Sequence, residues 1–70
     1  MTYEVTHYLP PGGLPYFLLR IRGYLLDEAQ RHGYTPVPGT YRLRISAIYN
    51  ERWRVRPLAY RVDASIQVQP

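Results

Sequence analysis

Arginine is the residue type whose spacing in this sequence most clearly favours a particular chemistry. All nine basic residues among the 70 are arginines, and with five acidic residues they give a formal net charge of +4. Guanidinium groups bind phosphate in a bidentate manner, and a basic balance favours nucleic acid as a partner. Five arginines fall at positions that one face of a β-hairpin can share. The predicted nucleic-acid-binding residues are therefore Arg42, Arg44, Arg54, Arg56 and Arg61.

The arginine content also has a plainer explanation. A chain with nine arginines and no lysine is typical of a GC-rich coding genome, in which arginine is the default soluble residue and the arginine face is simply solvated. Small size and the absence of lysine suit a compact accessory protein of a phage or a GC-rich bacterium. Both interpretations of the arginine residues stay open at this stage.

Aromatic residues provide an alternative function. The chain holds eight tyrosines and one tryptophan, and Tyr, Trp and Arg are enriched at the energetic centres of protein interfaces. A core this small cannot enclose all of these rings. Protein–protein interaction, or a structural accessory role, is therefore the alternative to nucleic-acid binding. The candidate partner-binding residues are Tyr8, Tyr16, Tyr24 and Tyr34.

Catalytic groups are scarce. The sequence has two histidines, two serines and no cysteine, so a nucleophile with a base and an orienting group has few residues to draw on. His7 is expected on a strand face and His32 at a helix end beside Glu28. The glycines near Pro10 lack the spacing of a phosphate-binding loop, and no metal-ligand spacing occurs. The sequence therefore predicts a protein that is not an enzyme, with no catalytic residues, no metal and no cofactor.

Two periodicities define the elements of the N-terminal half. Apolar residues alternate from Thr2 to Leu9, which predicts a strand over residues 2–9 that ends at the following Pro-Pro-Gly-Gly turn. From Leu14 to His32 they recur every three or four residues, which predicts a helix over 14–32 that Gly33 stops. The β-favouring run over 16–21 leaves open an extended conformation for part of residues 16–24. Residues 34–39 are expected to be a connection.

The C-terminal half alternates almost continuously. The pattern predicts strands over 40–49 and 53–68, joined by a turn at 50–52 and interrupted by a β-bulge at Pro57. In this register Leu43 lies opposite Tyr60 and Arg42 opposite Arg61. Like charges directly opposite one another cost some tenths of a kcal/mol, roughly, and a bound anion would offset that cost.

Together these elements predict a single α+β domain over residues 1–70. The expected architecture is β-α-β-β, with one helix on an antiparallel three-stranded sheet, the long last strand in the centre and a long bulged C-terminal hairpin. The helix is expected to cover the apolar face of the sheet. The predicted core comprises Tyr3, Val5, Phe17, Leu18, Ile21, Leu25, Leu43, Ile45, Trp53, Val55, Tyr60 and Val62.

The short chain and an unpaired strand edge predict self-association. A chain of this length buries only about 60% of the surface that its unfolded form exposes, and it has no disulfide to stabilise it. Ala64, Ile66 and Val68 run past the point where Thr40 can pair with them, so either the first strand or a second chain covers the edge of 64–68. With no signal segment or membrane span, a cytoplasmic location and no membrane partner are expected.

Overall fold

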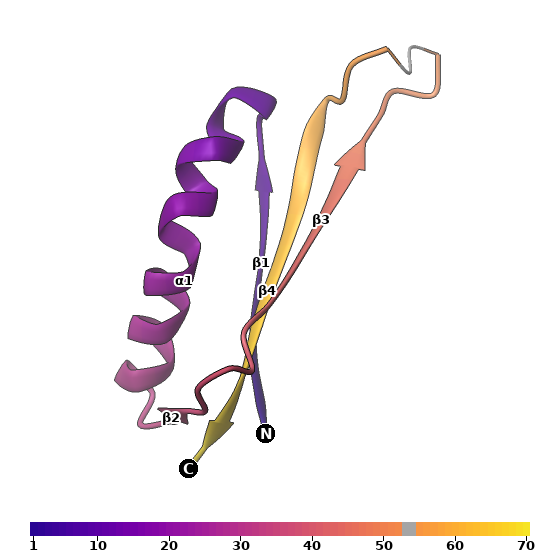
Figure 1. Ribbon diagram of the computed structural model, residues 1–70. Helices are drawn as coiled ribbons and strands as arrows, with labels where there is room; N and C mark the ends of the chain where they lie inside the picture. Colours follow the sequence, from indigo (N-terminus) through magenta and orange to yellow (C-terminus); the bar gives the residue numbers. More distant parts are fainter. Residues whose placement is uncertain (53–54) are drawn as a thin grey trace.

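The protein folds into one helix on an antiparallel sheet, an α+β fold (Figure 1). The computed structural model describes residues 1–52 and 55–70. The elements, in chain order, are β1 (Thr2–Leu9), a 3-10 turn η1 (Pro11–Gly13), α1 (Leu14–Arg31), β2 (Thr35–Pro36), β3 (Arg42–Ile48) and β4 (Ala59–Gln69).

β4 is the central strand of the sheet. It pairs with β1 from Thr2↔Gln67 to Leu9↔Tyr60, and on its other side with β3 and β2. The central position of the long last strand and its antiparallel pairing are confirmed. The expected number of strands and the β-α-β-β order need correction, because the connection predicted over 34–39 contains the short strand β2. β2 pairs with Val68 and Gln69 of β4, beyond the point where β3 begins to pair at Ser65.

The register of the hairpin differs from the predicted one. Arg42 lies opposite Ser65 rather than Arg61, and Leu43 lies opposite Ala64 rather than Tyr60. The cause is a longer connection: β3 ends at Ile48 and β4 begins only at Ala59. The predicted bulge at Pro57 therefore falls in this connection. The apolar row of β4, from Val62 to Val68, packs under the helix and is buried.

α1 is helical throughout residues 16–24, so the extended alternative is wrong. Its buried residues, Ile21, Leu25 and Ala29, recur every four positions and form one stripe. The helix ends in a Schellman motif, in which the Gly33 N–H donates to the Gln30 carbonyl and the Tyr34 N–H to the Ala29 carbonyl, each at 3.0 Å. Gly33 has a φ of 82°, which permits this reversal.

The core lies between α1 and β4. Predicted core residues Ile21, Leu25 and Val62 are fully buried, and Tyr3, Val5 and Phe17 are partly buried against them. Leu18 and Tyr60 are half-buried. The core also contains four residues that the prediction omitted, Ala29, Ala64, Ile66 and Val68.

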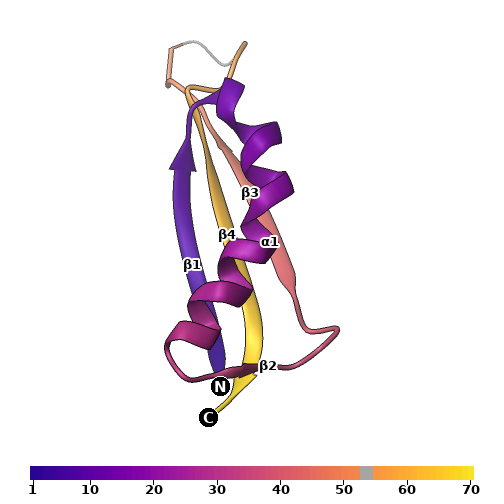
Figure 2. The ribbon, with the colours of Figure 1, turned by 90° about the vertical axis from the view of Figure 1, so that its left-hand side faces the viewer.

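Three predicted core residues are exposed instead. Leu43 is 41% exposed, Ile45 42% and Val55 80%, whereas Trp53 lies outside the described residues. The reason is the position of the helix, which packs on β4, β2 and β1 and leaves the hairpin to lean away from it (Figures 1 and 2). With the hairpin projecting, the molecule measures 46 × 20 × 19 Å.

The edge of 64–68 is paired within the chain on both sides. On one side it pairs with β1, so the first strand covers this edge, which was one of the two predicted alternatives. On the other side the Gln67 N–H donates to Thr40 Oγ1 at 3.0 Å, and the Val37 N–H donates to the Gln67 carbonyl at 2.9 Å. A second chain therefore has no free backbone there, and the predicted homo-oligomer through this edge is wrong.

Gly33→Ala is expected to destabilise the fold by about 1–2 kcal/mol, because a Cβ atom disfavours positive φ. Gly23→Ala is the matched control. Gly23 lies within α1 with a negative φ and open space around it, so alanine there is expected to stabilise by about 0.5–1 kcal/mol. Urea denaturation measures both changes. Equal shifts in the same direction would contradict the Schellman ending.

Candidate functional site

One face of the sheet is not covered by α1. Directly paired residues of an antiparallel sheet share a face, so the register assigns each side chain to the helix side or to the uncovered side. We call the uncovered side the open face. Its members are Thr2, Glu4, Thr6 and Tyr8 of β1, Arg42, Arg44, Ser46 and Ile48 of β3, and Ala59, Arg61, Asp63, Ser65 and Gln67 of β4.

The open face brings together three of the five predicted nucleic-acid-binding residues. Arg42, Arg44 and Arg61 line a shallow depression of about 260 Å³ together with Glu4 and Asp63. The expected opposition of two arginines does not occur, because Arg42 faces Ser65, Arg44 faces Asp63 and Arg61 faces Ser46. The repulsion that was expected to require a bound anion is therefore absent.

Asp63 is the centre of the polar contacts on this face. Its Oδ1 accepts hydrogen bonds from Thr6 Oγ1 at 2.6 Å and from Arg61 Nε at 3.1 Å. The Thr6 hydrogen bond is the largest influence that lowers the pKa of Asp63, followed by the hydrogen bond and charge of Arg61 and the charge of Arg44. The same carboxylate raises the pKa of Arg61. Asp63 is thus ionised and holds the Arg61 guanidinium in place.

Arg42 and Arg44 differ from Arg61 in their pairing. Among the described residues neither of them forms an ion pair, whereas Arg61 pairs with Asp63 at 3.1 Å. Three arginines and two carboxylates give the open face a formal charge of +1. Within residues 1–52 and 55–70, two guanidinium groups can therefore bind an anion without breaking an ion pair.

The remaining predicted arginines belong to the connection between β3 and β4. Arg56 is exposed there, together with Arg52, and Arg54 lies outside the described residues. A second depression, of about 430 Å³, is lined by Asn50, Val55, Arg56 and Leu58. Arg56 thus lies at the end of the hairpin and not with the three arginines of the open face.

The four candidate tyrosines do not form one patch. Tyr8 is 64% exposed on the open face, and Tyr16 is 74% exposed on α1. Tyr24, 47% exposed, makes an edge contact with the ring of His7 at 5.8 Å. Tyr34 is half-buried against the core, with its ring 6.1 Å from that of Tyr3. Only Tyr8 therefore lies beside the arginines.

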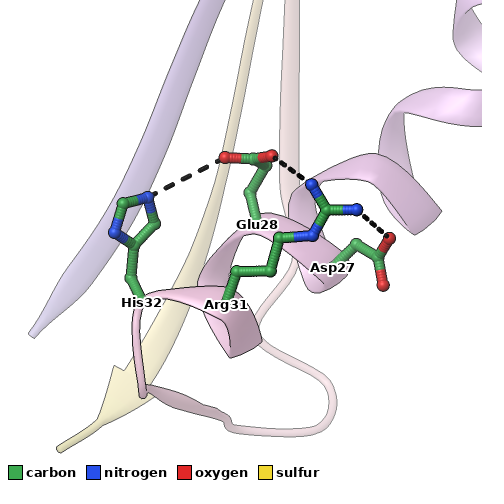
Figure 3. A network of polar contacts seen from close by, with 4 residues as sticks. All are labelled: Asp27, Glu28, Arg31 and His32. Atoms are coloured by element: carbon green, nitrogen blue, oxygen red, sulfur yellow. Dashed lines mark ion pairs between the residues drawn. The ribbon is translucent and has the colours of Figure 1, made fainter.

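Both histidines have structural surroundings. The His7 ring lies 4.9 Å from that of Phe17, between β1 and α1. At the end of α1, His32 Nε2 is 3.8 Å from Glu28 Oε2, and Arg31 bridges Glu28 and Asp27 at 3.7 and 3.6 Å (Figure 3). Arg31 is the basic residue in the last turn, where a cation interacts favourably with the helix dipole. Within the part of the chain described, no three His, Cys, Asp or Glu residues lie close enough to hold a metal ion.

The sequence reasoning missed an exposed apolar row. Leu43, Ile45 and Ala47 of β3 lie on the helix side of the sheet, since they pair with Ala64, Val62 and Tyr60, but α1 does not cover them. Alternation identified the face on which they lie. It carried no signal about how far the helix extends across that face.

Comparisons with protein-family models, curated proteins and solved structures find no match to this chain. In residues 1–52 and 55–70, no helix combines the length and the apolar character needed to cross a membrane. Function is therefore inferred from the chain's own exposed side chains.

Stability is expected to fall in acid through Asp63. Its folded pKa is lowered, so the stabilisation is fully present above the unfolded pKa, about 4, and is lost as pH falls through the folded value. The stability difference between the wild type and Asp63→Asn should therefore shrink below pH of about 4, as urea midpoints across a pH series would show. Asp27→Asn is the control, because its pair with Arg31 is largely exposed and contributes little. A difference that is constant down to pH of about 2 would contradict this role of Asp63.

Proposed function

We propose that this protein is a small, non-enzymatic binding module that engages nucleic-acid phosphates through its open face. The observation that carries the proposal is that Arg42 and Arg44, which form no ion pair with any described residue, lie beside Arg61 on the sheet face that α1 leaves open. Guanidinium groups bind phosphate oxygens in a bidentate manner and stay charged at all relevant pH values.

The shape of the hairpin supports the same function. β3 pairs with β4 at the margin of the sheet, and this hairpin leans away from α1 (Figure 1). Arg52 and Arg56 add positive charge at the end of the hairpin. Phosphate contacts position a protein without reading bases, so binding is expected to be largely independent of sequence.

Glu4 and Asp63 moderate this interaction. They reduce the charge of the open face, so binding depends on local geometry more than on a broad positive field. Asp63 also orients Arg61 through its hydrogen bond. Removing the Asp63 carboxylate would therefore increase the charge and loosen the guanidinium at the same time.

A protein partner is the second candidate. The observation that favours it is the apolar surface at the hairpin end, where Tyr49 is 46% exposed, Leu58 59% and Val55 80%. Exposed apolar patches mark interaction sites. A partner bound there, with Tyr8 or Tyr16 as further anchors, would be bound mainly by apolar contacts.

Catalysis is not part of the proposal. His7 packs against aromatic rings and His32 Nε2 lies 3.8 Å from a carboxylate oxygen of Glu28, and these contacts support structural roles for both histidines. The chain has no cysteine, which fits a reducing, cytoplasmic location. The proposed context is a phage-encoded or GC-rich bacterial accessory protein.

Binding to a labelled mixed-sequence DNA duplex at low salt tests the proposal. The double variant Arg42→Gln/Arg44→Gln is expected to bind about tenfold or more weakly, since each lost charge-assisted contact contributes on the order of 1 kcal/mol. Arg20→Gln is the control for charge, because it removes one guanidinium group from the exposed surface of α1, against two in the double variant. Equal losses in the two proteins, or no binding by the wild type, would contradict the proposal.

A further inference from the structure

β3 has one edge that no described segment of the chain pairs with. It pairs with β4 along its full length, from Arg42↔Ser65 to Ile48↔Ala59, and lies at the margin of the sheet (Figure 1). Proteins usually protect such an edge with charge, proline or a covering element, because it exposes backbone donors and acceptors. Seven residues of β3 form this edge.

The backbone groups that point outward can be identified. The Ile48 carbonyl accepts a hydrogen bond from the Leu58 N–H at 2.7 Å, so the polar groups of Ile48 face β4. Alternate residues of an antiparallel strand direct their N–H and C=O groups to opposite sides. Arg42, Arg44 and Ser46 thus face β4 as well. Leu43, Ile45 and Ala47 direct their backbone groups to the free edge.

The same three residues form the exposed apolar row on the helix side of β3. Leu43 is 41% exposed and Ile45 42%, and Ala47 is exposed too. The free edge therefore combines unpaired backbone with uncovered apolar side chains. The edge of β1 differs, because Glu4, Thr6 and Tyr8 alternate there with residues that α1 covers.

We propose that β3 pairs with β3 of a second copy of this chain, antiparallel, about a two-fold axis at Ile45. Ile45 then faces Ile45, and Leu43 faces Ala47, so all three outward-directed residues of the strand exchange paired backbone hydrogen bonds. This register also limits repulsion between the two strands, whose only charged residues are arginines. Arg44 faces Ser46 and Arg42 faces Ile48, so no arginine lies directly opposite another, whereas an axis at Arg44 would oppose two of them.

The resulting dimer has a closed, isologous interface. Its sheet runs β1-β4-β3-β3-β4-β1, with both helices on one side and both open faces on the other, because directly paired residues share a face. Arg42, Arg44 and Arg61 of the two copies would then lie on one continuous surface. This pairing also accounts for the apolar residues that α1 leaves uncovered.

Sedimentation of the full chain across a concentration series, without nucleic acid, tests the dimer. A monomer–dimer equilibrium is expected, and Ile45→Lys is expected to weaken dimerisation by about tenfold or more. Leu19→Lys is the matched control, since Leu19 is 84% exposed on α1 and lies away from β3. A wild-type monomer at all concentrations, growth beyond a dimer, or equal effects of the two variants would overturn the proposal.

An engineered disulfide between the two copies tests the β3–β3 register, even if Ile45→Lys fails to fold. The chain has no cysteine, so an introduced one has no competitor. Across a hydrogen-bonded pair the Cα atoms lie about 5.5 Å apart, within reach of a disulfide. Ile45→Cys should crosslink under mild oxidation, and Glu4→Cys on the edge of β1 should not. Equal crosslinking of the two, or none at Ile45→Cys, would contradict pairing at β3. Because no DNA is present, this outcome is independent of the nucleic-acid test.

Discussion

Raising the salt concentration from about 50 to about 200 mM is expected to weaken binding to duplex DNA by about 40-fold per chain. Each phosphate that a cation neutralises releases counterions, which contributes a log–log slope of about −0.9. Contacts from Arg42, Arg44 and Arg61 give a slope of about −2.7. Contacts from the hairpin arginines, Arg52 and Arg56, would make the slope steeper.

Fluorescence anisotropy of a labelled mixed-sequence duplex, repeated over a salt series, measures this slope. A single strand of the same length is the parallel substrate, for which the slope per contact is about −0.7. Binding that salt does not weaken would show that apolar contacts dominate. That result would favour the protein-partner alternative at the hairpin end.

Leu25→Ala is expected to destabilise the protein by about 2–5 kcal/mol. The side chain is fully buried in the cluster that joins α1 to β4, so its truncation removes apolar contacts and leaves a cavity. A domain of this size has a small free energy of unfolding, so a large fraction of the variant molecules would be unfolded.

Urea denaturation followed by circular dichroism measures this loss, with Leu19→Ala as the control. Leu19 is 84% exposed on the same helix, and its truncation is expected to change stability by no more than about 0.5 kcal/mol. Similar losses in the two variants would contradict the assignment of the core to the interface between α1 and β4.

Periodicity predicted the helix, the three long strands and the faces of their side chains, but it missed β2 and placed the start of the last strand too early. The stripe of Ile21, Leu25 and Ala29 marks one side of a helix, and the alternation along β1 and β4 marks strands. Because both periods are local, they depend little on the rest of the fold. For the same reason Arg42, Arg44 and Arg61 were assigned to a common face, on which they lie.

The register could not be predicted in this way. Moving the partner of Arg42 from Arg61 to Ser65 keeps every side chain on its face, because the shift is an even number of residues. Alternation therefore cannot distinguish the two registers, and the length of the connection decides between them. The longer connection places Arg44 opposite Asp63, which removes the predicted charge repulsion.

The sequence also did not show which part of the sheet the helix covers. Leu43 and Ile45 have the pattern of core residues, and the sequence does not indicate that α1 stops short of β3. An apolar residue on a helix-side face is buried only where the helix reaches it. The exposed row on β3 is thus a feature of packing that no local pattern reveals.

The salt dependence of DNA binding by Arg42→Gln/Arg44→Gln tests the central claim most directly. Loss of two phosphate contacts is expected to flatten the log–log slope by about two units, while Arg20→Gln leaves it unchanged. An unchanged slope in the double variant, or an equal flattening in Arg20→Gln, would show that the open face is not the surface that binds nucleic acid.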